Sequence, residues 1–265
     1  MRSALHGWRS LWALLKALVA REIAGRYRGS WLGLGWAVIG PLLMLMLYTT
    51  VFTQVMQVRW PTSGGAGRGH FALMVYAGMV IHGFIAEILC NAPTAVIRQA
   101  NYVKRVVFPM PLLPLVTAGT ACCTLLIGLV LLATMTALAG GPANSALLLL
   151  PLCVLPALLF GVAAAWALAA IGTFLRDLPH VMGFVATALL FASPVFYPPE
   201  AVPDMLRAVM RWNPLAWSIV PLRAVIQGEW PELAPLLWRT LGLCFAAGAA
   251  LWLYRRVQRS FADVL

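Results

Sequence analysis

An uncharged stretch behind a short basic turn constrains this chain more than any other feature. From Trp31 to Val58 there is no Asp, Glu, Lys, Arg or His. At about 1.5 Å per residue, a helix of this length can cross the ~30 Å hydrocarbon layer of a bilayer. A short basic turn precedes the run and suits a phosphate-rich membrane surface. We predict a first crossing at 32–56, entered from the cytoplasm through Arg26, Arg28 and Trp31.

The composition indicates that lipid surrounds most of the chain. Of the 265 residues, 62% are hydrophobic and 10% are charged, whereas a soluble domain carries roughly 25% charged residues. A net charge of +11 would suit a nucleic-acid-binding protein. The basic residues, however, stand beside apolar runs, as they do at the ends of membrane helices. We therefore expect membrane lipids as partners and no nucleic acid.

Six apolar runs, separated by polar or Gly- and Pro-rich turns, predict an all-α integral membrane protein with six transmembrane helices in a single domain, 1–265. The fifth run is shorter than the ~20 residues that an upright crossing needs. The predicted spans are 32–56, 71–90, 112–138, 147–174, 181–197 and 233–254.

Two further segments are expected to lie at the membrane surfaces. The segment 5–25 carries apolar residues on one helical face and basic residues mostly off it, which favours an amphipathic helix in the interface. A soluble partner-binding helix is the alternative. The segment 198–228 is too apolar for a solvated loop, and its short helical stretches cannot cross. We predict an outer re-entrant region there, covered by protein or by a water-filled cavity.

Charge asymmetry predicts the orientation. Of the 19 Lys and Arg residues, 13 fall on the side of the two termini and six on the other side, so the positive-inside rule places both termini in the cytoplasm. Arg207, Arg211 and Arg223, on the outer side, are expected to be plain loop charges or contacts to lipid phosphates. Glu87 is the only carboxylate placed inside a span, which favours a functional group, an ion pair or a snorkelled interfacial side chain.

Several kinds of chemistry are missing from the sequence. Neither lysine, Lys16 or Lys104, follows a glycine, so the G-x-x-x-x-G-K-[ST] phosphate loop is absent. G-x-S-x-G and H-E-x-x-H motifs are absent too, and the cysteines and histidines have no metal-ligand spacing. We expect no catalytic residues, no metal and no cofactor in this chain. A pore whose energy comes from another subunit fits better than an enzyme or a self-powered carrier.

Motifs along almost the whole chain resemble one family. The opening, Arg26 to Gly33 with Trp36, Tyr48 and Phe52, looks like that of polysaccharide-export ABC transporter permeases of the type-2 family. These are the membrane halves of O-antigen, capsule and teichoic-acid exporters. Further similar stretches follow in order at Asn101–Pro109, Phe174–Asp177, Ser193–Pro198, Trp212–Leu215 and Phe261–Leu265.

The resemblance implies partners and an energy source. Two copies of the permease pair with two cytoplasmic ABC ATPase subunits, which bind Mg-ATP, and move a lipid-linked polysaccharide across the bacterial inner membrane. The segment 94–105 corresponds to the coupling helix that docks on the ATPase. From its position we expect a short rigid element able to push on both adjoining spans. Its candidate contact residues are Arg98, Gln99, Asn101, Tyr102, Lys104 and Arg105.

The resemblance also implies a glycan channel and an outer exit gate. Flat aromatic faces suit pyranose rings, so Trp36, Tyr48, Phe196 and Tyr197 are channel candidates, although an interfacial aromatic belt would place the same residue types. The outer re-entrant helices would form the gate. Its candidate residues are Pro194, Pro203, Asn213 and Pro214.

Three alternatives differ in their energy source, chemistry or cargo. A secondary transporter or channel without an ATPase would transport without ATP and fail when the ion gradient collapses. A membrane transferase acting on lipid-linked sugars would need clustered carboxylates or histidines, and the sequence shows none. An ABC permease could also carry another amphipathic, lipid-like substrate.

Overall fold

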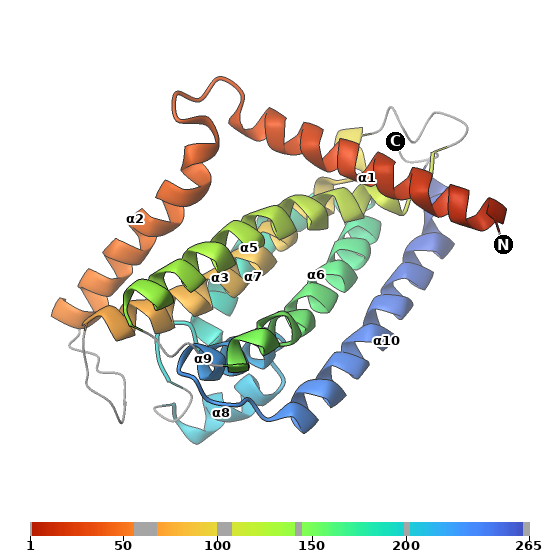
Figure 1. The fold of residues 1–265 in the computed structure, drawn as a ribbon. Coiled ribbons are helices and arrows are strands. Elements are labelled where there is room, and N and C mark those ends of the chain that lie inside the picture. Colours follow the sequence, from red (N-terminus) through yellow and green to blue (C-terminus); the bar gives the residue numbers. More distant parts are fainter. Residues whose placement is uncertain (1, 56–67, 100–107, 141–144, 199–201, 262–265) are drawn as a thin grey trace.

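The computed structural model describes residues 2–55, 68–99, 108–140, 145–198 and 202–261 (Figure 1). These residues form helices and turns, with no strand among them, as the prediction of an all-α protein requires. The α-helices are α1 (Arg2–Tyr27), α2 (Trp36–Thr50), α3 (Arg68–Asn91), α5 (Leu112–Leu138), α6 (Leu150–Gly172), α7 (Leu178–Ala192), α8 (Asp204–Arg211), α9 (Ala216–Ile226) and α10 (Leu233–Val257). Shorter turns of 3₁₀ or π type are η1 (Gly33–Gly35), η2 (Val51–Val55), η3 (Ala92–Thr94), η4 (Ile97–Gln99), η5 (Ser145–Leu149) and η7 (Gln258–Ser260).

Within these described ranges, five helical segments are long and apolar enough to cross a membrane. Two more helices, α7 and α9, are apolar but shorter. The five long segments are Gly33–Thr50, Gly69–Thr94, Leu112–Leu138, Ala146–Gly172 and Leu233–Ser260.

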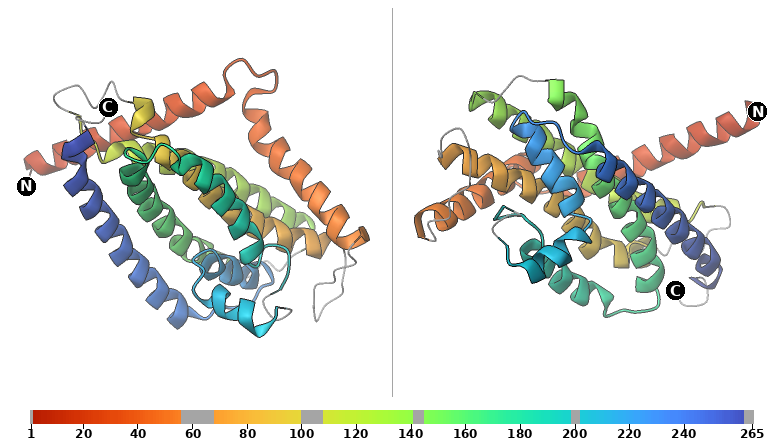
Figure 2. Two further views of the ribbon diagram at one scale, coloured as in Figure 1. Left: turned by 180° about the vertical axis from the view of Figure 1, so that it is seen from behind. Right: turned by 90° about the horizontal axis from the view of Figure 1, so that it is seen from below.

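The long helices run side by side between two ends of a bundle (Figures 1 and 2). Helix α1 lies across one end, where α10 also finishes, and α8 and α9 lie at the opposite end. Helix α3 is central, packing on α5, α6 and α7, while α10 packs on α6. In the segment that contains α3, 61% of the most apolar 18-residue stretch is buried inside the bundle. In the segment that contains α2 the share is only 11%. Most of the surface of α2 is therefore not covered by other parts of this chain.

The core is built on the buried face of α3. Ile81, Phe84 and Ile88 of this helix are almost completely buried and belong to one hydrophobic cluster with Ala121 of α5 and Ala165 of α6. Lipid tails are as apolar as these side chains, so van der Waals packing, rather than removal from water, holds such helices together. Small residues facing large ones let the helix backbones approach closely.

Proline and glycine mark the ends of two of the predicted helices. One of these helices has the predicted bounds and the other is shifted. Helix α5 has the predicted bounds, between Pro111 and Gly140. Helix α7 lies at Leu178–Ala192 instead of 181–197. It begins early because Pro179 is tolerated in a first turn. It ends early because Ser193 becomes extended, with ψ 154°, as expected of a residue before proline.

Candidate functional site

The connection between α3 and α5 is packed onto the ends of other helices. Between its turns η3 and η4 lie Ala95 and Val96, and both side chains are buried. The second hydrophobic cluster joins this connection to the start of α5 and the ends of α6 and α10. Its buried members are Ala95, Val96, Leu113, Ala169, Ala170, Tyr254 and Phe261.

The closest contact of this connection joins Pro93 of η3 to Gly172 at the end of α6. A Cβ added at Gly172 would lie 2.2 Å from the carbonyl oxygen of Pro93 and 2.6 Å from its Cα. Both are backbone atoms and cannot rotate away. Only glycine therefore allows α6 and η3 to meet at this distance.

Two hydrogen bonds hold the entrance of α5 to the same assembly. The Tyr254 hydroxyl of α10 donates to the carbonyl of Met110 at 3.1 Å. The indole Nε1 of Trp166, in α6, donates to the carbonyl of Pro111 at 3.1 Å. The ends of α3, α5, α6 and α10 are thus packed into one unit.

The described part of the predicted coupling segment 94–105, residues 94–99, belongs to this unit. The structure differs from the predicted short helix: 3₁₀ turns occupy 92–99, because contacts with α6 rather than helix propensity fix this backbone. Arg98 is exposed and its Nη2 donates to the Asn91 Oδ1 at 3.2 Å. Gln99 is partly buried. The remaining predicted contact residues, Asn101, Tyr102, Lys104 and Arg105, lie outside the described residues.

Helix α1 is attached to the same end of the bundle. The Nη2 of Arg26 lies 2.7 Å from the Oε1 of Glu87 in α3. A Cβ at Gly119 in α5 would come within 2.7 Å of Val19 Cγ2, so α1 crosses α5 at close range. The other residues of the predicted membrane-entry turn contact little within the chain: Arg28 is exposed and Trp31 is 98% exposed.

The electrostatics of the Arg26–Glu87 pair keep the guanidinium charged. Partial burial of Arg26 lowers its pKa, but the hydrogen bond and the negative charge of Glu87 outweigh this effect, so the pKa of Arg26 is raised above its ordinary value. Of the three roles expected for Glu87, the structure thus shows an ion pair.

Three of the four predicted channel aromatics lie together. The Phe196 ring stacks on Phe52 at 4.6 Å between centroids and lies 4.8 Å from the Tyr48 ring. The Tyr197 hydroxyl donates to the carbonyl of Phe191. Phe196 is fully buried and offers no ring face to a substrate within this chain, because neighbouring rings cover it. Trp36 is twelve residues before Tyr48 on α2, about 18 Å away along the axis, and is separate from this cluster.

Asn213 fastens the outer segment to the end of α7. Its Nδ2 donates to the Ser193 Oγ at 2.9 Å and to the carbonyl of Ala192 at 3.2 Å, and its Oδ1 accepts from the Leu215 amide at 3.0 Å. Of the other predicted gate residues, Pro194 lies in the same turn, Pro214 follows Asn213, and Pro203 precedes α8. The structure thus brings Pro194, Asn213 and Pro214 together.

Helix α9 is anchored by two buried polar side chains. Arg223 Nε donates to the carbonyl of Met74 in α3 at 2.9 Å, and its Nη2 donates to that of Val195 at 2.7 Å. Ser218 Oγ accepts from the Ala157 amide at 2.9 Å, next to Pro156, which interrupts the hydrogen-bond ladder of α6. These contacts fix α9 between α3 and α6.

The described residues contain no group of three or more His, Cys, Asp or Glu that could hold a metal ion. Among the same residues, the polar side chains at the two ends of the bundle hold helices in place. None of them forms a pair of a nucleophile with a base. Such an arrangement can transmit movement between the ends of a bundle.

Comparison with known proteins identifies the family of this chain. The family described as ABC-2 type transporter matches residues 13–226. The chain belongs to the ABC-2 type transporter family. It is 29% identical over 253 residues to the O-antigen export system permease protein RfbA of Myxococcus xanthus, covering 94% of each chain. Two proteins of the same name from Klebsiella pneumoniae are each 23% identical and match over 96% of both chains.

In this ABC-2 transporter chain, the residues that the sequence analysis missed are those that fix the helices. Arg223 was expected to be a loop charge or a lipid contact, yet it is buried. Its signal was available: it stands among apolar residues at the helical spacing of Ile219, Leu222 and Ile226. Ser218 has no such signal, because a serine in an apolar helix is common.

Proposed function

We propose that this chain is the channel-forming membrane subunit of an ATP-driven exporter that moves a lipid-linked polysaccharide across the bacterial inner membrane. The observation that carries the proposal is the extent of the likeness: relatives named as O-antigen export permeases align over 94–96% of this chain. The alignments leave only 4–6% of this chain unmatched. The family membership supports the ABC ATPase as the energy source.

In this proposal, two copies of the chain enclose the channel and two cytoplasmic ATPases bind Mg-ATP and drive it. The unit around η3 and η4 is the docking point, with Arg98 exposed toward the partner. Its contacts with α5, α6 and α10 support this role, since a push on the turns would reach several spans at once. The exposed surface of α2 leaves apolar area for the second copy and for lipid.

Six crossings with both termini in the cytoplasm complete the topology. Helix α7, of 15 residues, covers about 22 Å, less than the ~30 Å hydrocarbon layer. It nevertheless runs from the end where α6 finishes toward the end where α10 begins (Figure 2). The turn after Ala192 completes the passage. The helices α8 and α9 then form the outer re-entrant region, and the charge asymmetry of the sequence supports an outer position for this end.

The test is complementation in cells that lack this chain. Restored polysaccharide at the cell surface is expected with an active partner ATPase, and none with a partner whose ATP hydrolysis is disabled. Charge reversal at Arg98, Lys104 and Arg105 together should leave the protein in the membrane and uncouple ATP hydrolysis from export. Export that continues without ATP and stops when the ion gradient collapses would overturn the proposal in favour of a secondary transporter.

A further inference from the structure

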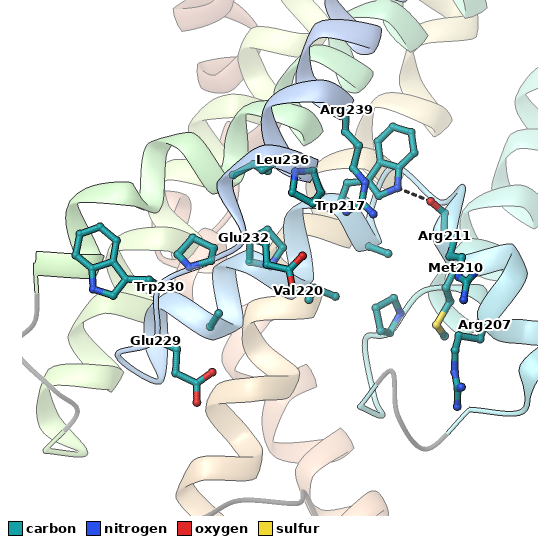
Figure 3. Close-up of a pocket in the computed structure, with 16 residues that line it drawn as sticks. Arg207, Met210, Arg211, Trp217, Val220, Glu229, Trp230, Glu232, Leu236 and Arg239 are labelled. Carbon is teal, nitrogen blue, oxygen red and sulfur yellow. Dashed lines mark hydrogen bonds between the residues drawn. The ribbon is translucent and has the colours of Figure 1, made fainter.

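A pocket of about 490 Å³ opens at the outer end of the bundle, among α8, α9 and the start of α10 (Figure 3). Its volume lies in the ~300–1,000 Å³ range of small-molecule sites. The charged and aromatic side chains that line it are Arg207, Arg211, Trp217, Glu229, Trp230, Glu232 and Arg239. Nothing in the proposed transport cycle uses them.

The pocket has two chemically different sides. Figure 3 shows Glu229 and Trp230 on one side, Trp217, Arg211 and Arg239 on the other, and Glu232 between them. The ion pairs found among the described residues of the chain are Arg26–Glu87 and Arg207–Asp204. Neither Glu229 nor Glu232 takes part in them. The carboxylates therefore face the pocket as free hydrogen-bond acceptors, opposite guanidinium donors.

One indole is fixed before any ligand arrives. Trp217 Nε1 donates to the carbonyl of Arg211 at 2.7 Å, and the Arg239 guanidinium lies over the Trp217 ring, 5.6 Å from its centroid. A ring held from two directions loses little freedom on binding a ligand, which favours affinity. Across the pocket, Trp230 is 62% exposed and offers a second flat, apolar face.

The charge balance decides the class of ligand. Arg211 and Arg239 contribute two positive charges, and Glu229 and Glu232 contribute two negative ones. The third arginine of the lining, Arg207, forms an ion pair with Asp204 at 3.0 Å, so the remaining charges of the lining balance. An anionic phosphate would gain from the arginines and be opposed by the carboxylates. A neutral sugar can donate hydroxyl protons to the carboxylates, accept from the guanidiniums and place the apolar C–H face of its ring on an indole.

We propose that this pocket binds a neutral pyranose segment of the glycan on the outer side of the membrane. The inference rests on the proposed function, because export brings the glycan to this side, beside α8 and α9. A bound segment would hold the emerging chain next to the turn that contains Pro194, which also lines the pocket.

The experiment uses the full chain with its ATPase partner in nanodiscs. The ligand is a set of fragments, two to six sugars long, released from the surface polysaccharide of the same cells. Binding is followed by saturation-transfer NMR. Trp230→Ala, and separately Glu229→Gln with Glu232→Gln, should each weaken binding about tenfold or more, as truncation of a central contact does. Trp212→Ala is the matched control: Trp212 is 82% exposed at the end of α8 and does not line the pocket.

Several outcomes would overturn the inference. These are no binding of the fragments, equal binding by the wild type and the pocket variants, or equal loss in Trp212→Ala. Inorganic phosphate displacing the fragments, or a signal that needs anionic lipid in the nanodisc, would assign the pocket to an anionic headgroup instead. Surface display of polysaccharide in complemented cells separates the two proposals. If the wild-type chain restores display and the pocket binds no fragment, the pocket inference alone fails. If it restores none, the proposed function fails.

Discussion

The Nη2 of Arg26 lies 2.7 Å from the Oε1 of Glu87, joining the last turn of α1 to the cytoplasmic-side end of α3 in the proposed topology. The glutamate side chain is 13% exposed and that of the arginine is 36% exposed, so solvent screens this pair in part. Such pairs are worth about 1 kcal/mol rather than the several kcal/mol of an ideal buried contact. Because η3 follows α3 directly, this contact connects α1 to the proposed docking unit.

The first prediction concerns this pair. Arg26→Gln and Glu87→Gln should each lower the thermal unfolding temperature in nanodiscs, and the double variant should lose less than the sum, with a coupling free energy of about 1 kcal/mol. Arg28→Gln is the matched control, since Arg28 is exposed, lies two residues after Arg26 and follows directly on the end of α1. Strictly additive losses would mean that the two side chains do not interact.

The second prediction concerns the contact between Gly172 and Pro93. Gly172→Ala places a Cβ against the backbone of Pro93, so η3 and α6 must separate, at a cost of about 1–3 kcal/mol or more. We expect a lower unfolding temperature and, because the docking unit is displaced, ATP hydrolysis that no longer drives export. Gly242→Ala in α10 is the control, because a Cβ there has nothing within 4 Å. Equal behaviour of the two variants would show that η3 shifts without consequence.

Much of the fold was predictable because local signals agree with the final structure. Pro111 and the glycine turn after Leu138 mark both ends of α5, and no tertiary contact changes them. The connection after α3 is different. Its sequence is compatible with the short helix predicted there, but the close contact of Pro93 with Gly172 is a tertiary feature. Nothing in the spacing of residues on either side indicates it.

The site was predictable in its location and less so in its residues. Basic side chains indicate the segment after α3, and prolines indicate the segment after α7. The partner of Arg223, however, is the carbonyl of Met74, 149 positions away in the sequence. Carbonyls are present at every residue, so no side-chain pattern identifies which of them an arginine meets.

The third prediction tests Arg223. Arg223→Met removes both donors and leaves the carbonyls of Met74 and Val195 without these partners, which should cost about 1–3 kcal/mol per group left unpaired. Arg223→Lys should restore part of the loss, because one ammonium cannot reproduce the fixed fork of a guanidinium. Arg255→Lys, at an exposed position near the end of α10, should be neutral. Thermal unfolding of the three variants checks the order, and equal stability of Arg223→Met and the wild type would contradict it.

The fourth prediction tests whether Asn213 holds the junction of α8 and α9. Asn213→Ala removes the acceptor of the Leu215 amide and the donor to Ser193 and Ala192, so the Leu215 amide should exchange with deuterium faster. Ser193→Ala removes only one of these bonds and should leave the Leu215 amide protected.

Hydrogen exchange measured by mass spectrometry distinguishes the two variants, with peptides from α5 as the internal reference. If the outer region acts as the gate, Asn213→Ala should also let a small neutral sugar leak through proteoliposomes in the absence of ATP, since the loosened α8–α9 segment opens without being driven. Faster exchange without leakage would separate the two roles: Asn213 would then fix the local fold while other contacts close the outer end. Unchanged exchange would show that the Leu215 amide is protected by the helix itself.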